Sequence, residues 1–162
     1  MIAEAGTKEA AWDAAAAVPD PEVPCVTVAE LGILRKVQLV NGIAVAQVTP
    51  TYSGCPATLA IELAIETALR DAGFEARIER VLSPAWTTDW ITEVGRDKLR
   101  AFGIAPPQTG MGKAALFGCP EVVCPRCGSD NTQRISEFGS TACKAHYQCK
   151  ACAEPFDYFK CI

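Results

Sequence analysis

The chemistry open to this chain of 162 residues rests on its nine cysteines, because it contains a single histidine, His146. A zinc protease needs a His-Glu-x-x-His motif, and a di-iron carboxylate oxygenase needs two Glu-x-x-His motifs on facing helices. Neither motif can be built with one histidine. The sequence therefore excludes both enzyme classes and directs attention to the thiols.

Four of the cysteines form two Cys-x-x-Cys pairs, which are Cys124 with Cys127 and Cys149 with Cys152. Each pair, here called a knuckle, places two thiolates on one tight turn, and four such sulfurs suit a tetrahedral metal site. The segments Thr132–Phe138 and Phe156–Phe159 are rich in β-forming residues, as a zinc ribbon requires. We therefore predict a structural zinc ion, because four protein ligands leave no open position; iron would fit the same sulfurs.

The other cysteines near the knuckles have no assigned role. Cys119 is one of them, and Cys143 and Cys161 could approach the metal, approach each other, or be small buried apolar residues. His146 lies three residues before Cys149 and could replace one ligand, although a strand residue at this place is more often a packing or capping residue.

Cys55 is the candidate functional thiol outside this region. It stands where a glycine-containing loop leads into Pro56 and a predicted helix, and the positive end of a helix dipole stabilises a thiolate. Thr51 and Ser53 could donate hydrogen bonds to it, and Cys25 could lie nearby. From these residues alone, a reactive thiol and a buried residue at a helix start are equally good interpretations. No independent catalysis is expected, because Cys55 lacks a nearby histidine as base.

The elements that position these residues can be read from the apolar pattern. Asn41-Gly42 between two β-rich runs predicts a hairpin, and a helix apolar on nearly every side predicts a buried one. The expected order is a helix over 8–18, strands over 33–40 and 43–49, a helix over 56–72, a strand over 74–82, and a helix from Thr88 or Asp89 to about 102. This order predicts an α+β fold with helices on one face of a small sheet, followed by an all-β ribbon.

The predicted domain boundaries are 1–103 for the α+β domain, 104–118 for a proline-containing linker and 119–162 for the ribbon. Fifteen Lys and Arg residues against nineteen Asp and Glu give a net charge of −4, which argues against nucleic-acid binding. No export signal and no apolar run of membrane-spanning length are found, so we predict a cytoplasmic protein with reduced thiols.

Several segments resemble known families. One set resembles the conserved blocks of the SufT-like iron–sulfur cluster assembly family: Asp20-Pro21-Glu22-Val23-Pro24, Glu30-Leu31-Gly32-Ile33, Thr51 and Cys55-Pro56. A second set is similar to the PaaD (PaaJ) family of accessory subunits of bacterial phenylacetyl-CoA epoxidase: 83–90, 138–144 and 154–161. The resemblance covers nearly the whole chain.

The resemblance implies a small mixed sheet and a non-catalytic accessory role in aerobic phenylacetate degradation. The role would be maturation of the iron–sulfur cluster or metal of the oxygenase or reductase. The expected partners are the epoxidase subunits or the reductase, and the expected cargo is a transient iron–sulfur cluster or iron. Cys55 matches the cysteine of the family, and Asp20 and Glu22 match its acidic loop. The alternative from the residues alone is a zinc-ribbon adaptor that binds a protein or a nucleic acid.

Overall fold

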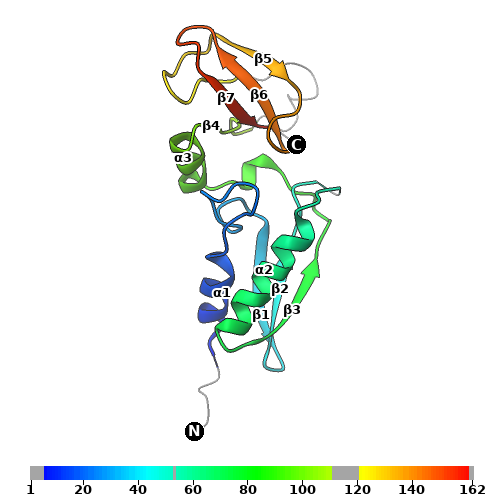
Figure 1. Cartoon of the computed structure of the whole chain (residues 1–162). Helices are drawn as coiled ribbons and strands as arrows, with labels where there is room; N and C mark the ends of the chain where they lie inside the picture. The colour runs from blue at the N-terminus through cyan, green and yellow to red at the C-terminus, as the bar shows by residue number, and fades with distance from the viewer. Residues whose placement is uncertain (1–5, 53, 111–120, 161–162) are drawn as a thin grey trace. The chain divides into compact units, whose positions relative to one another are not determined.

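The computed structural model describes residues 6–52, 54–110 and 121–160 (Figure 1). Contacts within the chain divide it into two compact units, Met1–Trp86 and Thr87–Ile162, which are described separately. The first unit combines helices with a three-stranded sheet, and the second contains a four-stranded sheet. The α+β fold class with a C-terminal β ribbon is therefore confirmed.

The first unit begins with α1 (Lys8–Ala16), where the Thr7 hydroxyl accepts a hydrogen bond from the backbone N–H of Ala10. Strands β1 (Leu34–Val40) and β2 (Ile43–Val48) form the predicted antiparallel hairpin. Asn41 and Gly42 both have positive φ angles, 51° and 83°, as a type I′ turn requires. The local turn signal in the sequence was sufficient to define this hairpin.

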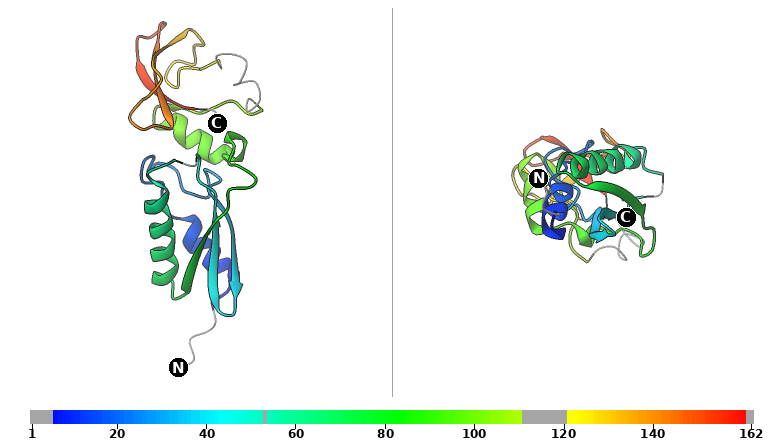
Figure 2. Two further views of the ribbon diagram at one scale, coloured as in Figure 1. Left: turned by 90° about the vertical axis from the view of Figure 1, so that its right-hand side faces the viewer. Right: turned by 90° about the horizontal axis from the view of Figure 1, so that it is seen from below.

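Strand β3 (Glu75–Arg80) pairs parallel with β2, so the sheet is mixed and has the order β1-β2-β3. The parallel pairing needs a crossover, which α2 (Thr58–Asp71) supplies. The two helices contact each other as well as the sheet, α1 mainly at β1 and α2 mainly at β3. They therefore lie side by side on one face of the sheet (Figures 1 and 2).

The prediction that α2 is buried on all sides was wrong. Ile61, Ile65 and Leu69 point into the core, with exposed fractions of 5%, 0% and 0%. Leu59 and Leu63 are 62% and 53% exposed. A helix on one face of a three-stranded sheet has a covered side and a solvent side, so two of the five leucine and isoleucine residues of α2 remain uncovered.

The second unit contains two short helices, η1 (Thr88–Trp90) and α3 (Glu93–Ala101). One continuous helix from Thr88 or Asp89 was expected, but the backbone of Ile91 is extended. This residue interrupts the helix, and a second helix begins after Thr92. The Thr92 hydroxyl accepts from the backbone N–H of Gly95, so Thr92 is the true N-cap of α3.

The sheet of the second unit has the order β4-β7-β6-β5. Its strands are β4 (Ile104–Ala105), β5 (Thr132–Ser136), β6 (Lys144–Cys149) and β7 (Pro155–Phe159). The core beneath it is a cluster of buried residues: Ala105, Val122, Cys124, Ala145, Tyr147, Cys149, Phe156 and Tyr158.

The domain boundary predicted at residue 103 differs from the observed division after Trp86. Ile104 and Ala105 belong to the ribbon sheet, where they pair parallel with Asp157 and Tyr158 of β7, and not to a linker. The α3 residue Arg96, 4% exposed, donates one hydrogen bond to the carbonyl of Thr88 at 2.7 Å and another to that of Pro107. These contacts join α3 to η1 and to the segment that follows β4, all within the second unit. Residues 111–118 of the predicted linker lie outside the described residues.

No helix among the described residues combines the length and the apolar character needed to cross a bilayer.

Candidate metal centre

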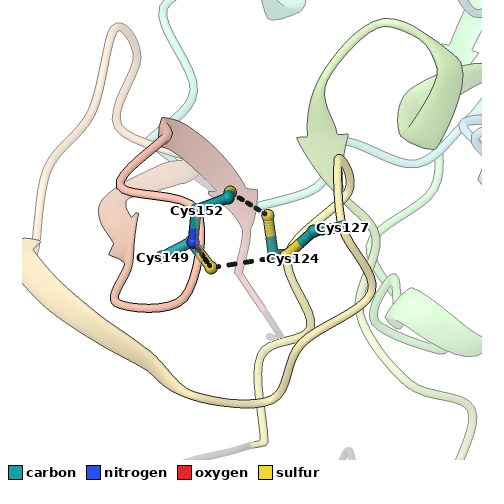
Figure 3. A group of neighbouring side chains, drawn as sticks. All are labelled: Cys124, Cys127, Cys149 and Cys152. Carbon is teal, nitrogen blue, oxygen red and sulfur yellow. Dashed lines mark hydrogen bonds between the residues drawn. The ribbon is translucent and has the colours of Figure 1, made fainter.

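The four knuckle cysteines converge on one point (Figure 3). Their sulfur atoms all lie within 4.8 Å of one another. The Cys124 and Cys152 sulfurs are 3.8 Å apart, and the Cys127 and Cys149 sulfurs are 3.6 Å apart. A tetrahedral site with metal–sulfur bonds of about 2.3 Å requires sulfur–sulfur distances of about 3.8 Å. The spacing therefore matches a single four-coordinate ion.

Each knuckle supplies one buried and one exposed thiol. Cys124 and Cys149 are 1% and 0% exposed and form part of the ribbon core, whereas Cys127 and Cys152 are exposed. The second knuckle is the turn that joins β6 to β7, so the register of these strands places Cys149 and Cys152. A metal at this point would connect the core of the ribbon to its surface.

Backbone N–H groups surround the sulfurs. The Cys127 thiol receives a backbone hydrogen bond from Ser129, and the Cys152 thiol receives the equivalent bond from Glu154. The N–H of Cys152 also lies 3.5 Å from the Cys149 sulfur. Such donors favour the thiolate, which is the form that binds a metal ion.

Without a cation, the pKa values of the Cys149 and Cys127 thiols shift in opposite directions. Backbone hydrogen bonds from Cys152 and Ala151 lower the pKa of Cys149 to about 7. The Ser129 N–H also lowers the pKa of Cys127, but the hydrogen bond to Cys149 and burial outweigh it and raise that pKa to about 12. A divalent cation removes this conflict, because it neutralises part of the thiolate charge. The donor set thus fits a soft-ligand metal site.

This tetrad is the one group of three or more Cys, His, Asp or Glu ligands with such geometry among the described residues. His146 does not belong to it; its Nδ1 lies 3.4 Å from Oδ1 of Asp157, whose Oδ2 accepts a hydrogen bond from Ser140. Cys143 is buried, with its sulfur 3.0 Å from the Thr141 hydroxyl. Cys119 and Cys161 lie outside the described residues.

In the first unit, the predicted acidic loop is organised by Asp20. Its carboxylate Oδ1 accepts backbone hydrogen bonds from Glu22 at 2.8 Å and Val23 at 2.9 Å, and the Asp20 N–H donates to the carbonyl of Val26. Asp20 is 6% exposed. Its carboxylate thus shapes the loop, while Glu22 is half-buried.

Cys55 lies on a turn three residues before the first residue of α2. Its N–H donates to the carbonyl of Tyr52 and its own carbonyl accepts from Thr58, both at 3.2 Å. Ala57 is the N-cap and makes no side-chain hydrogen bond to the helix. Cys55 is half-buried and Thr51 is buried; Ser53 lies outside the described residues. Cys55 is not part of a group of three ligands among the described residues, so a stable metal site there would need further ligands.

Sequence reasoning missed two contacts that hold the family segments together. Thr27 and Glu30 form a reciprocal capping box, in which the Thr27 N–H donates to the Glu30 carboxylate and the Glu30 N–H donates to the Thr27 hydroxyl. The Thr-x-x-Glu pattern was a readable signal for it. The indole N–H of the buried Trp86 donates to the carbonyl of Leu31, 55 residues away, and no local pattern could reveal that contact.

Two family models match the chain. Residues 8–82 match a model described as an iron–sulfur cluster assembly protein, and residues 108–160 match the PaaD zinc beta ribbon domain. A protein of Escherichia coli (strain K12), provisionally named as one of the subunits of 1,2-phenylacetyl-CoA epoxidase, is 51% identical over 93% of this chain and 91% of its own length. The crystal structure of a domain of unknown function, DUF59, from Bacillus anthracis shares 25% identity with a TM-score of 0.52. It covers 57% of this chain and 90% of its own.

The fold and the cysteine site define the class: a DUF59-like α+β domain joined to a four-cysteine zinc ribbon. The chain belongs to the PaaD family of phenylacetyl-CoA epoxidase subunits.

Proposed function

We propose that this chain is an accessory protein of a phenylacetyl-CoA epoxidase system in aerobic phenylacetate degradation. It would assist the maturation of the iron–sulfur cluster or metal of the oxygenase or reductase. The observation that carries the proposal is the 51% identity over 93% of the chain to the Escherichia coli epoxidase protein, together with the match of residues 8–82 to an iron–sulfur assembly model. The cytoplasm is the expected location.

The tetrad is proposed to hold one structural zinc ion. The match to a zinc ribbon supports zinc. Two sulfur pairs lie 3.8 and 3.6 Å apart, as a four-coordinate ion requires, and all four positions are filled by protein thiolates. A closed site of this kind stabilises a fold and leaves no position for substrate. The chemistry of maturation is therefore assigned to the first unit.

Cys55 is proposed as a transient ligand for iron or a cluster that passes to a partner protein. It lies on a half-buried turn before α2, and its sulfur has no complete ligand set of its own among the described residues. A site short of ligands binds weakly and can release its cargo to a partner that completes the coordination. Thr51, Asp20 and Glu22 are proposed to support the thiol, with Asp20 acting through the loop shape that it imposes.

The test is substitution Cys55→Ala in a cell whose epoxidase depends on this protein. We expect the iron and sulfide content of the purified oxygenase and reductase to fall severalfold, with epoxidase activity falling in proportion. Cys143→Ala is the matched control, because it removes a thiol that lies outside both proposed sites. Full cluster content and activity with Cys55→Ala would overturn the role of Cys55.

Metal and acid-labile sulfide analysis of protein purified without oxygen provides an independent check. We expect one zinc per chain from the tetrad, with substoichiometric iron and sulfide that disappear in the Cys55→Ala variant. Two or more tightly bound irons with sulfide in the wild-type chain and also in the Cys55→Ala variant would contradict the assignment of the cargo to Cys55.

A further inference from the structure

Strand β5 (Thr132–Ser136) has an open edge. It is the last strand in the order β4-β7-β6-β5, so among the described residues it pairs with β6 on one side only (Figure 1). All six residues from 133 to 138 are exposed, whereas most of β6 and β7 is buried or half-buried. Neither face of most of this strand is covered within the described part of the chain.

The unpaired backbone groups of β5 can be assigned from the ladder. The Lys150 N–H donates to the carbonyl of Asn131 at 2.8 Å, which makes this a hydrogen-bonded pair. Such pairs alternate along antiparallel strands, and Arg134 stands opposite Tyr147 at a non-hydrogen-bonded position. The N–H and C=O of Arg134 therefore point away from β6, toward the open edge.

A β-bulge adds an apolar side chain to this edge. The register shifts between Arg134 and Ser136, so Ile135 has no partner in β6 and remains 54% exposed. Phe138, three residues later, is 64% exposed, and the Lys160 ammonium lies 4.4 Å from the centre of its ring. Bulges are common at sheet edges and next to active sites, where they change the direction of a side chain.

The other open edges of the two sheets carry more charge or are shorter. Strand β3 carries the ion pairs Arg77–Glu79 and Arg80–Glu62, and β4 has two residues. Strand β1 exposes Arg35 and Lys36 at its start, although Leu39 and Val40 at its end are 36% and 44% exposed. Charges and short strands are the usual protection against pairing with another chain. On β5, Arg134 is the single charged residue, no described carboxylate forms an ion pair with it, and the residue that the bulge leaves exposed is an isoleucine.

We propose that the open edge of β5 binds an extended segment of a partner protein, which adds a fifth strand to the ribbon sheet. Backbone bonds to Arg134 would supply the pairing. A carboxylate of the segment would face the Arg134 guanidinium, and apolar side chains would cover Ile135 and Phe138, since opposite charges and apolar pairs favour cross-strand contact. The identity of the partner rests on the proposed function: it is a protein of the epoxidase system.

The experiment measures binding of the full zinc-loaded chain to each purified oxygenase and reductase protein of the system by calorimetry. Arg134→Pro removes the outward N–H without removing a bond to β6, because proline is tolerated at edge positions whose N–H faces solvent. Arg134→Ala keeps that N–H and removes only the charge. We expect Arg134→Pro to weaken binding to one of these proteins by about tenfold or more, and Arg134→Ala by about threefold.

Hydrogen exchange of the wild-type complex gives a readout that does not depend on whether the proline variant folds. The Arg134 amide is expected to exchange at least about tenfold more slowly in the complex than in the free chain. Binding to none of these proteins, or binding without protection of this amide, would overturn the proposal. Cys55→Ala should bind normally. Intact docking of this variant together with full cluster content of the oxygenase and reductase would refute the proposed role of Cys55 and leave the docking proposal standing.

Discussion

Ala153 has a backbone conformation that glycine normally adopts. Its φ is 62°, and it follows Cys152 as Gly128, with φ 75°, follows Cys127. At each place the left-handed residue turns the next N–H, that of Glu154 or Ser129, toward the preceding sulfur. The two knuckles therefore share one geometry, but in the second the alanine carries backbone strain that the glycine avoids.

Ala153→Gly is expected to stabilise the zinc-loaded ribbon by about 0.5–1 kcal/mol, because glycine adopts this φ without a Cβ clash. Denaturant unfolding of the second unit, followed by hydrogen exchange at several denaturant concentrations, would measure the difference.

Gly128→Ala is the matched reverse change. A Cβ at residue 128 would meet no atom within 4 Å, so any loss comes from the backbone conformation alone. We expect a loss of about 1 kcal/mol. A destabilising effect of Ala153→Gly would show that the side chain of Ala153 contributes more than its strained backbone costs.

At the level of elements, α2 shows how neighbours decide the role of a leucine or isoleucine. Ile65 is completely buried against the sheet, and Leu63, two residues earlier, is 53% exposed. Outside the buried face, α2 carries two charge pairs, Glu62 with Arg80 and Glu66 with Arg70. Such exposed pairs contribute little stability, so the buried face holds the helix to the sheet.

Ile65→Ala should destabilise the first unit by about 2–5 kcal/mol, whereas Leu63→Ala should change its stability by less than about 0.5 kcal/mol. Denaturant unfolding of the full chain can be followed in this unit by hydrogen exchange of the β1 and β2 amides at several denaturant concentrations. Equal losses for the two variants would mean that the exposed face of α2 is covered in solution.

At the level of the whole molecule, the two units differ in what stabilises them. The first has a continuous apolar core between the helices and the sheet. The second has a small core in which two of the eight cluster members, Cys124 and Cys149, are metal-ligand candidates. A structural zinc ion contributes about 10–16 kcal/mol of apparent binding free energy, which exceeds what so small a core supplies.

Removal of the metal should therefore unfold one unit and spare the other. After treatment with a strong chelator, we expect amides of β6 and β7 to exchange about 100-fold faster or more, with those of β1 and β2 unchanged. Re-addition of zinc should restore protection. Unchanged protection in β6 and β7 after the metal is lost would show that the ribbon folds without it.

Much of the metal site and part of the fold could be predicted because their signals are local. The spacing within each knuckle follows from one turn, and the Asn41-Gly42 hairpin follows from two residues that tolerate positive φ. The prediction of an accessory protein rested on whole segments that resemble known families, and a family model can match such segments without any structure.

The sequence by itself thus determined the four thiols, the hairpin and the family, since each depends on residues that are close in the chain or on segment identity. Only the tertiary structure decided that Ile104 joins β7, that α2 has an exposed face and that Ile135 is left uncovered at the edge of β5. The physical reason is that burial and strand pairing depend on residues distant in sequence. The spacing of a knuckle is set within four residues, whereas the neighbours of β4 and α2 are chosen by packing.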